Sequence, residues 1–148
     1  MNDTRCLLSH FATHDELAWL VDHPDAVLEA LQPPWIYVFP MTVIRTVQRV
    51  PALRTPVLAA CDSALCSLAK ELDQLPPHTG MRSHFLGNQW CAYHHIKETL
   101  TEMLACVHPG CSHLAEPPRA DWTHAPPIEV LFPVCEEHLL PGTYEVID

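Results

Sequence analysis

The chain has 148 residues, a length that fits one domain or two very small ones, and 48% of them are hydrophobic, enough for a real core. The formal net charge of -10, from 18 acidic and 8 basic side chains, disfavours a protein that binds nucleic acid through a broad basic face. No window approaches the ~20 apolar residues of a membrane-spanning helix. The N-terminus has no apolar run typical of a signal peptide, so we expect a cytoplasmic protein.

Two short helices, or one kinked helix, are predicted across residues 13–31. Thr13 and Glu16 have the spacing of a capping box, in which each side chain bonds the backbone of the other residue. Apolar residues then recur with a helical spacing, and Pro24 interrupts the pattern before it restarts. The pair Pro33-Pro34 ends this region.

Residues 35–39 and 42–50 are rich in β-branched and aromatic side chains, which is typical of strands. The stretch from Ala30 to Cys61 contains three arginines and no acidic residue (Arg45, Arg49 and Arg54). In so acidic a chain these arginines form a local positive island. They are expected either on the solvent face of a strand or in contact with an acidic partner.

The rest of the chain is predicted to alternate between helices, loops and strands. Helices are expected over 63–75, which Pro76 ends, and over 91–104, where apolar residues fall on one side. Residues 76–90 and 115–127 are expected to be mainly loop. Residues 128–132 and 143–147 are strand candidates.

Four residues of metal-ligand type occur twice, in the same order and at a nearly constant offset of 45 or 44 residues. The first copy consists of Cys61, Cys66, Cys91 and His94. The second copy consists of Cys106, Cys111, Cys135 and His138. We interpret the repeat as duplication of a metal-binding unit.

The chemistry of each copy fits zinc, because a structural Zn²⁺ takes four ligands in a tetrahedron and three Cys with one His form a standard set. Seven cysteines in a cytosolic chain are metal ligands or core thiols rather than a disulfide framework. We expect one zinc ion in each copy, and at the least one in the second. The first site requires a helix that begins near Ser63 or later, and His95 could replace His94 there.

At the level of motif, the pattern resembles the treble-clef and zinc-knuckle class of zinc fingers. In the second copy, His108-Pro-Gly110 is a natural turn between the first two cysteines, and Cys135-x2-His138 follows a predicted strand. The resemblance covers 105–138, and 60–95 less fully; four residues separate the paired cysteines, where the usual knuckle has two. The class implies a zinc-stabilised scaffold and no particular function.

Two other metal patterns compete for some of these residues. Cys111-x-His113 with Cys135-x2-His138 has the bare spacing of a Rieske iron–sulfur centre, although the usual glycines are missing. Cys6, His10 and His14 would share one face of a helix that began before Thr13, so they are either a third site or an ordinary surface trio.

These observations predict an α+β fold with a helical and β part over 1–58 and two tandem zinc-finger-like units over 59–104 and 105–148, packed as one body. The expected function is a zinc-binding, non-enzymatic module that recognises another protein. Two alternatives stay open. One is a nucleic-acid-associated regulator that uses the arginine island. The other is a metal-dependent enzyme or an accessory subunit, although no phosphate loop or nucleophile elbow occurs.

Overall fold

The computed structural model describes residues 3–77, 80–103 and 111–115. The chain divides into two compact units, Met1–Thr101 and Glu102–Asp148. Apart from a single bridge residue at Leu114, the regular secondary structure of the described residues is entirely helical. In chain order these are α1 (Thr4–Leu8), α2 (His14–Asp22), α3 (Pro24–Ala30), α4 (Pro40–Arg49), the 3₁₀ helix η1 (Pro51–Leu53), α5 (Arg54–Asp73) and α6 (Gly80–Glu102).

The predicted α+β fold is therefore wrong, because the segments expected to supply its N-terminal β part are a helix and an irregular connection. The expectation of loop over 76–90 is also wrong from residue 80 onward, where α6 begins. The helices predicted over 63–75 and 91–104 are confirmed within α5 and α6. The strands predicted over 128–132 and 143–147 lie outside the described residues.

The two short helices predicted across 13–31 are confirmed as α2 and α3. Thr13 and Glu16 form the expected capping box: the Thr13 hydroxyl accepts from the Glu16 amide at 3.2 Å, and the Glu16 carboxylate accepts from the Thr13 amide at 2.9 Å. Pro24 is the first residue of α3, where its missing N–H has no helical partner to lose.

Helix α4 occupies residues expected to form a strand. It starts at Pro40, whose fixed φ suits a first helical position. Its apolar β-branched side chains fall on one helical face and are fully buried (Val43, Ile44 and Val47). Arg45 and Arg49, four residues apart, lie on the more exposed side. Burial of this face outweighs the modest intrinsic preference of β-branched residues for strands.

The connection at 35–39 has strand-like composition, but its backbone is bonded by side chains rather than by a neighbouring strand. The Gln89 amide donates to the Trp35 carbonyl oxygen at 3.2 Å, and the Tyr93 hydroxyl donates to the Ile36 carbonyl oxygen at 2.9 Å. Both donors come from α6, so this helix fixes the path of the connection. The strand prediction fails here because α6 satisfies the carbonyl groups that a strand would have used.

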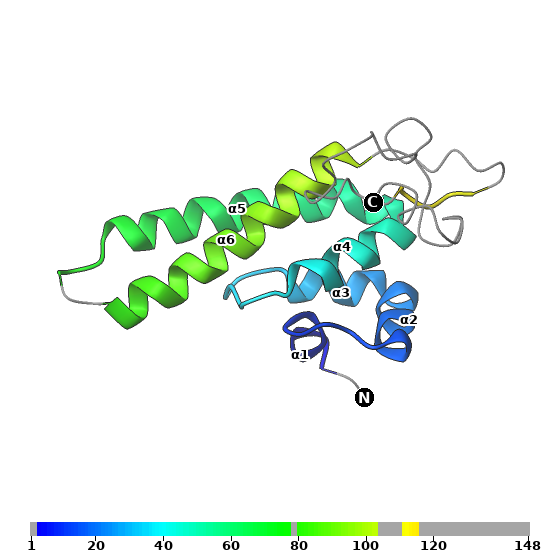
Figure 1. Cartoon of the computed structure of the whole chain (residues 1–148), viewed down its shortest axis with the longest axis horizontal. Helices are drawn as coiled ribbons and strands as arrows, with labels where there is room; N and C mark the ends of the chain where they lie inside the picture. The colour runs from blue at the N-terminus through cyan, green and yellow to red at the C-terminus, as the bar shows by residue number, and fades with distance from the viewer. Residues whose placement is uncertain (1–2, 78–79, 104–110, 116–148) are drawn as a thin grey trace, which may run out of the picture. The chain divides into compact units, whose positions relative to one another are not determined.

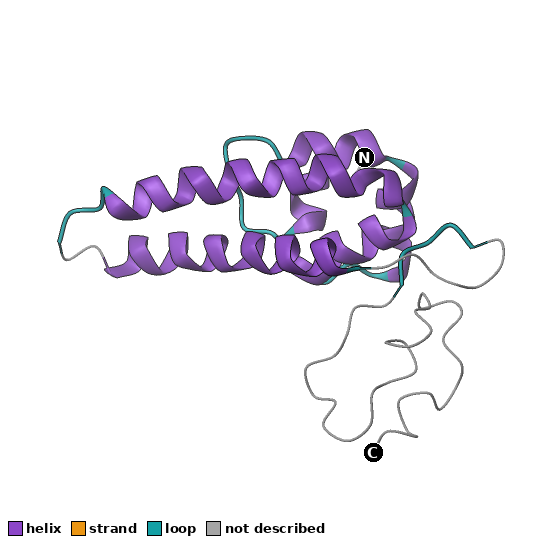
Figure 2. Cartoon of the chain, turned by 90° about the horizontal axis from the view of Figure 1, so that it is seen from above, coloured by secondary structure: helices purple, strands orange, loops and turns teal. Residues whose placement is uncertain are grey.

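Helices α5 and α6 are the two longest and lie side by side, running in opposite directions (Figures 1 and 2). At one end of the pair, Arg54 Nε of α5 donates to the Leu100 carbonyl oxygen of α6 at 2.8 Å. Further along, Lys97 Nζ lies 2.6 Å from an Asp62 carboxylate oxygen. We call α5 and α6 together the hairpin; the shorter helices α1–α4 lie together beside one half of it (Figure 1).

Candidate functional site

The first predicted zinc site falls on α5 and α6. Cys61 and Cys66 both lie inside α5, which begins at Arg54 and not near Ser63 as the site requires. Residues five apart on a helix are rotated by about 140° from each other. Accordingly, the side chain of Cys61 is buried while that of Cys66 is exposed. The structure does not bring these two thiols together.

The other two predicted ligands of that site lie on α6 and have different partners. Cys91 is exposed. The His94 ring stacks on Trp90, with centroids 4.7 Å apart, and its Nε2 lies 3.3 Å from a Glu98 carboxylate oxygen. His95, which could replace His94 as a ligand, is exposed. Within residues 3–77, 80–103 and 111–115 there is no group of three or more His, Cys, Asp or Glu that could hold a metal ion.

The second predicted zinc site lies mostly outside the described residues, which exclude Cys106, Cys135 and His138. Cys111 is described and half-buried, and its sulfur accepts a 3.4 Å hydrogen bond from the backbone amide of His113. This site therefore stays a prediction from the sequence.

The candidate trio near the N-terminus does not share a helical face, because α1 ends at Leu8 and α2 starts at His14. Cys6 is exposed. His10 lies between the helices, with its Nε2 3.2 Å from both carboxylate oxygens of Glu16. The Thr13 backbone amide and the His10 ring, in that order of effect, hold the pKa of Glu16 below its usual value. This arrangement is a helix cap and not a ligand set.

The arginine island is engaged in interactions within the fold. Arg45 Nη1 donates to the Gln48 side-chain oxygen at 2.9 Å. Arg54 donates to two backbone oxygens near the end of α6, those of Leu100 at 2.8 Å and Thr101 at 3.3 Å. These carbonyl groups belong to the last turn of the helix, which lacks intrahelical partners. The Arg54 guanidinium therefore acts as a helix cap.

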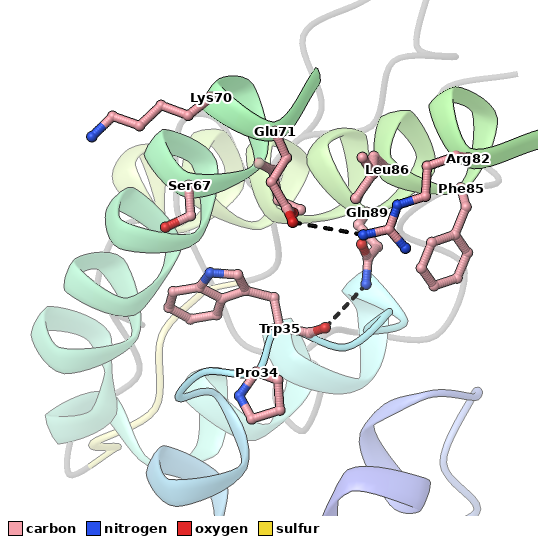
Figure 3. Close-up of a pocket in the computed structure, with 10 residues that line it drawn as sticks. Pro34, Trp35, Ser67, Lys70, Glu71, Arg82, Phe85, Leu86 and Gln89 are labelled. Carbon is pink, nitrogen blue, oxygen red and sulfur yellow. Dashed lines mark hydrogen bonds and ion pairs between the residues drawn. The ribbon is translucent and has the colours of Figure 1, made fainter. Parts of the chain in front are cut away.

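A pocket of about 480 Å³ lies between α5, α6 and the Pro34-Trp35 connection (Figure 3). We call it the hairpin groove. Its walls combine apolar and polar side chains (Pro34, Trp35, Ser67, Leu68, Lys70, Glu71, Arg82, Phe85, Leu86 and Gln89). Trp35 packs edge-on against Tyr93 at 6.2 Å between ring centroids, which holds the indole in position.

The apolar residues of the groove continue onto the exposed surface of α6. Leu68 and Leu86 are buried, whereas Phe85 keeps 51% of its surface exposed. One helical turn before Phe85, Met81 is 91% exposed. Large apolar side chains in this position are not explained by core packing, and adjacent exposed apolar groups mark surfaces that bind other molecules.

Charged groups line the outer edge of the groove. Arg82 Nη2 of α6 lies 3.6 Å from a Glu71 carboxylate oxygen of α5, and both side chains are about half exposed. Such an exposed pair contributes little to stability. Lys70 is exposed and makes no ion pair within the described ranges. The Lys70 side chain points away from Arg82 and from the Trp35 ring (Figure 3).

Two buried titratable groups, the thiol of Cys61 on α5 and the phenol of Tyr93 on α6, belong to the core. Burial raises the pKa of the Cys61 thiol to about 12 and that of the Tyr93 hydroxyl to about 12. At neutral pH both groups therefore keep their protons. A thiol in this state is a core residue and not a reactive centre.

Sequence reasoning missed the hairpin groove: its α5 residues were expected to be helical, but Trp35 was expected in a strand and residues 82–89 in a loop. A helical signal was present: Arg82, Phe85, Leu86 and Gln89 have the spacing i, i+3, i+4, i+7 of one helix face. Pro76, Pro77 and Gly80 nearby masked this signal.

Comparison of the chain with protein-family models, with curated proteins and with solved structures gave no match. In the described ranges, no helix combines the length and apolarity needed to cross a bilayer. The assignment of function therefore rests on the residues themselves.

Proposed function

We propose that this protein is a non-enzymatic module that binds another protein through the hairpin groove and the exposed face of α6. The observation that carries this proposal is the exposure of Met81 (91%) and Phe85 (51%) beside a pocket of about 480 Å³. Aromatic and methionine side chains are enriched where proteins contact each other. Because Lys70 and Arg82 border the same surface, the contact has a polar rim around an apolar centre.

The proposal is tested by a photo-crosslinking amino acid, benzoylphenylalanine, introduced at position 85 in cells that naturally make the protein. The same group is introduced at position 55 as a control, because Thr55 is an exposed residue of α5 outside the groove. We expect a discrete protein adduct from position 85 and none from position 55. Equal adducts from both positions, or none from position 85, would refute the proposal.

We further propose that the C-terminal segment binds one zinc ion through Cys106, Cys111, Cys135 and His138, which would hold that segment in a defined conformation. The support is the Cys3His ligand set and the natural turn between the first two cysteines. Elemental analysis of the purified chain tests it. Cys135→Ser should release the metal, and Cys6→Ser, which changes an exposed thiol of α1, should leave the metal content unchanged.

The two alternative functions receive no specific support. Binding of nucleic acid through the arginine island conflicts with the role of Arg54, whose guanidinium is bonded to carbonyl oxygens of α6. A metal-dependent enzyme would need a ligand set with an open position. The described ranges contain no candidate metal cluster.

A further inference from the structure

The first turns of α6 present a line of side chains with the spacing of paired helices. They lie at the end of the hairpin that extends past α1–α4 (Figure 1), and residues 80–85 are all exposed. Met81, Phe85, Asn88 and Ala92 follow one another at intervals of four, three and four residues. This spacing places them on one helical face and is typical of the contact line between two packed helices. We call these four residues the α6 stripe.

A hollow lies at the end of the α6 stripe that is nearer the middle of the helix. Its volume is about 460 Å³, and it is lined by Asn88, Cys91 and Ala92 of α6 together with Tyr37 of the preceding connection and Pro40 of α4. At the other end of the stripe, the side chain of Met81 projects into solvent and is 91% exposed. The stripe therefore combines a projecting apolar group and a hollow on the same face.

A projecting group and a hollow on one face fit a second copy of the same chain. In a dimer with two-fold symmetry every contact between unlike residues occurs twice, so two projecting groups fill two hollows at once. If the two α6 helices are antiparallel, this register brings residue 85 of each copy to the two-fold axis, because that position lies midway between Met81 and the α6 residues of the hollow. Phe85 is 51% exposed, and aromatic side chains at the centre of a contact give much of its binding free energy.

The charge of this surface also favours a second copy. No residue of the α6 stripe or of the hollow is acidic or basic. Two chains that each have a net charge of -10 can therefore meet here without bringing like charges into contact, which elsewhere would cost binding free energy. An uncharged surface also offers no counter-ion to a charged ligand, so the occupant is expected to be apolar at the contact.

We infer that the α6 stripe is the contact surface of a two-fold dimer of this chain. The two α6 helices run antiparallel, Met81 of each copy enters the hollow of the other, and the two Phe85 rings meet at the axis. This inference rests on the proposed function, because it names the molecule that binds the exposed face of α6.

Sedimentation equilibrium of the purified full-length chain, from about 1 µM to about 500 µM, tests the inference. We expect a reversible equilibrium between monomer and dimer. Phe85→Glu places two carboxylates against each other at the axis and should raise the Kd of the dimer at least about a hundredfold. Met81→Glu should raise it at least about tenfold, because a carboxylate would then enter an uncharged hollow. The matched control, Thr55→Glu, makes the same change in net charge at an exposed position of α5 and should leave the Kd within about twofold of the original.

The monomer should tolerate these changes. Met81 lies in the first turn of α6 with its side chain exposed, and a carboxylate is favourable at a helix N-terminus. Circular dichroism of each variant confirms that the helices are retained. A chain that stays monomeric at every concentration would overturn the inference, as would a dimer whose Kd the two α6 variants raise no more than Thr55→Glu does.

A second measurement separates this inference from the proposed function. Irradiation of the purified chain with benzoylphenylalanine at position 85 should give a covalent dimer, and absence of this product from a dimeric sample would also overturn the inference. If the purified chain is monomeric while position 85 crosslinks a different protein in cells, the inference fails and the proposed function stands. If position 85 gives no adduct in either experiment, both fail.

Discussion

The hydroxyl of Tyr93, a fully buried residue of α6, donates a 2.9 Å hydrogen bond to the carbonyl oxygen of Ile36 in the connection before α4. Through this contact the second helix of the hairpin fixes a segment 57 residues earlier in the chain. The neighbouring carbonyl of Trp35 is held by Gln89 of the same helix. The indole that lines the hairpin groove is therefore positioned by α6.

Tyr93→Phe should destabilise the fold by about 1 kcal/mol, because the phenol no longer donates to the Ile36 oxygen inside the core. The free energy of unfolding is measured by urea denaturation. The matched control is Tyr37→Phe, which removes the hydroxyl of an exposed tyrosine in the same connection and should change stability by less than about 0.5 kcal/mol. Equal losses in the two variants would contradict the role assigned to the Tyr93 bond.

Gly87→Ala should stabilise the chain by roughly 0.5–1 kcal/mol, because glycine in a helix interior costs backbone entropy. Gly87 lies in the middle of α6, and a Cβ built there has no heavy atom within 4 Å apart from its own helix backbone. Gly80→Ala serves as the control at the first residue of α6, where helix propensity counts for less. Urea denaturation in which Gly87→Ala lowers stability would show that α6 does not continue through residue 87.

The stability that Glu16 provides should be lost in acid. Its folded-state pKa lies below the ordinary value of 4.5, so the stabilisation is present above that pH and disappears as the pH falls through the lowered pKa. Melting temperatures of the original chain and of Glu16→Gln should therefore differ at pH 6 and converge toward pH 3. Glu29→Gln, at an exposed position of α3, is the control for the loss of one negative charge. A constant difference for Glu16→Gln across this range would argue against an ionised cap.

Thiol labelling should separate the cysteines of the hairpin. Cys66 and Cys91 are exposed and should react with iodoacetamide in the native chain, as should Cys6. Cys61 is buried with a pKa of about 12, so it should react only after unfolding. Mass spectrometry of the digested chain identifies the modified residues. Protection of both Cys66 and Cys91 that a chelator removes would show instead that they hold a metal, as the first copy of the repeat predicts.

The helices across 13–31 could be predicted because a local signal decides them: the capping box of Thr13 and Glu16 lies within one turn. The region 42–50 could not be predicted from composition, since Val43, Ile44 and Val47 suit a strand or a helix and tertiary burial makes the choice. The four-residue spacing of Arg45 and Arg49 is the helical signal in this stretch.

The candidate site was harder to predict than the fold, because the groove joins residues that are distant in the sequence. Trp35, Lys70 and Phe85 come from a connection and two helices, and only the packing of the hairpin brings them to one pocket. The spacing of the predicted metal ligands, in contrast, is visible directly in the sequence. On the continuous helix α5, however, the spacing of Cys61 and Cys66 places the two thiols on different faces.

The bonds from Arg54 to the last turn of α6 mean that this turn is completed by a residue 46 positions earlier. Arg54 thus supplies donors to carbonyl groups that have no partner within the helix itself. These two donors reach Leu100 and Thr101 only when the start of α5 lies against the end of α6, so this part of the helix end is completed by tertiary packing and not by local sequence.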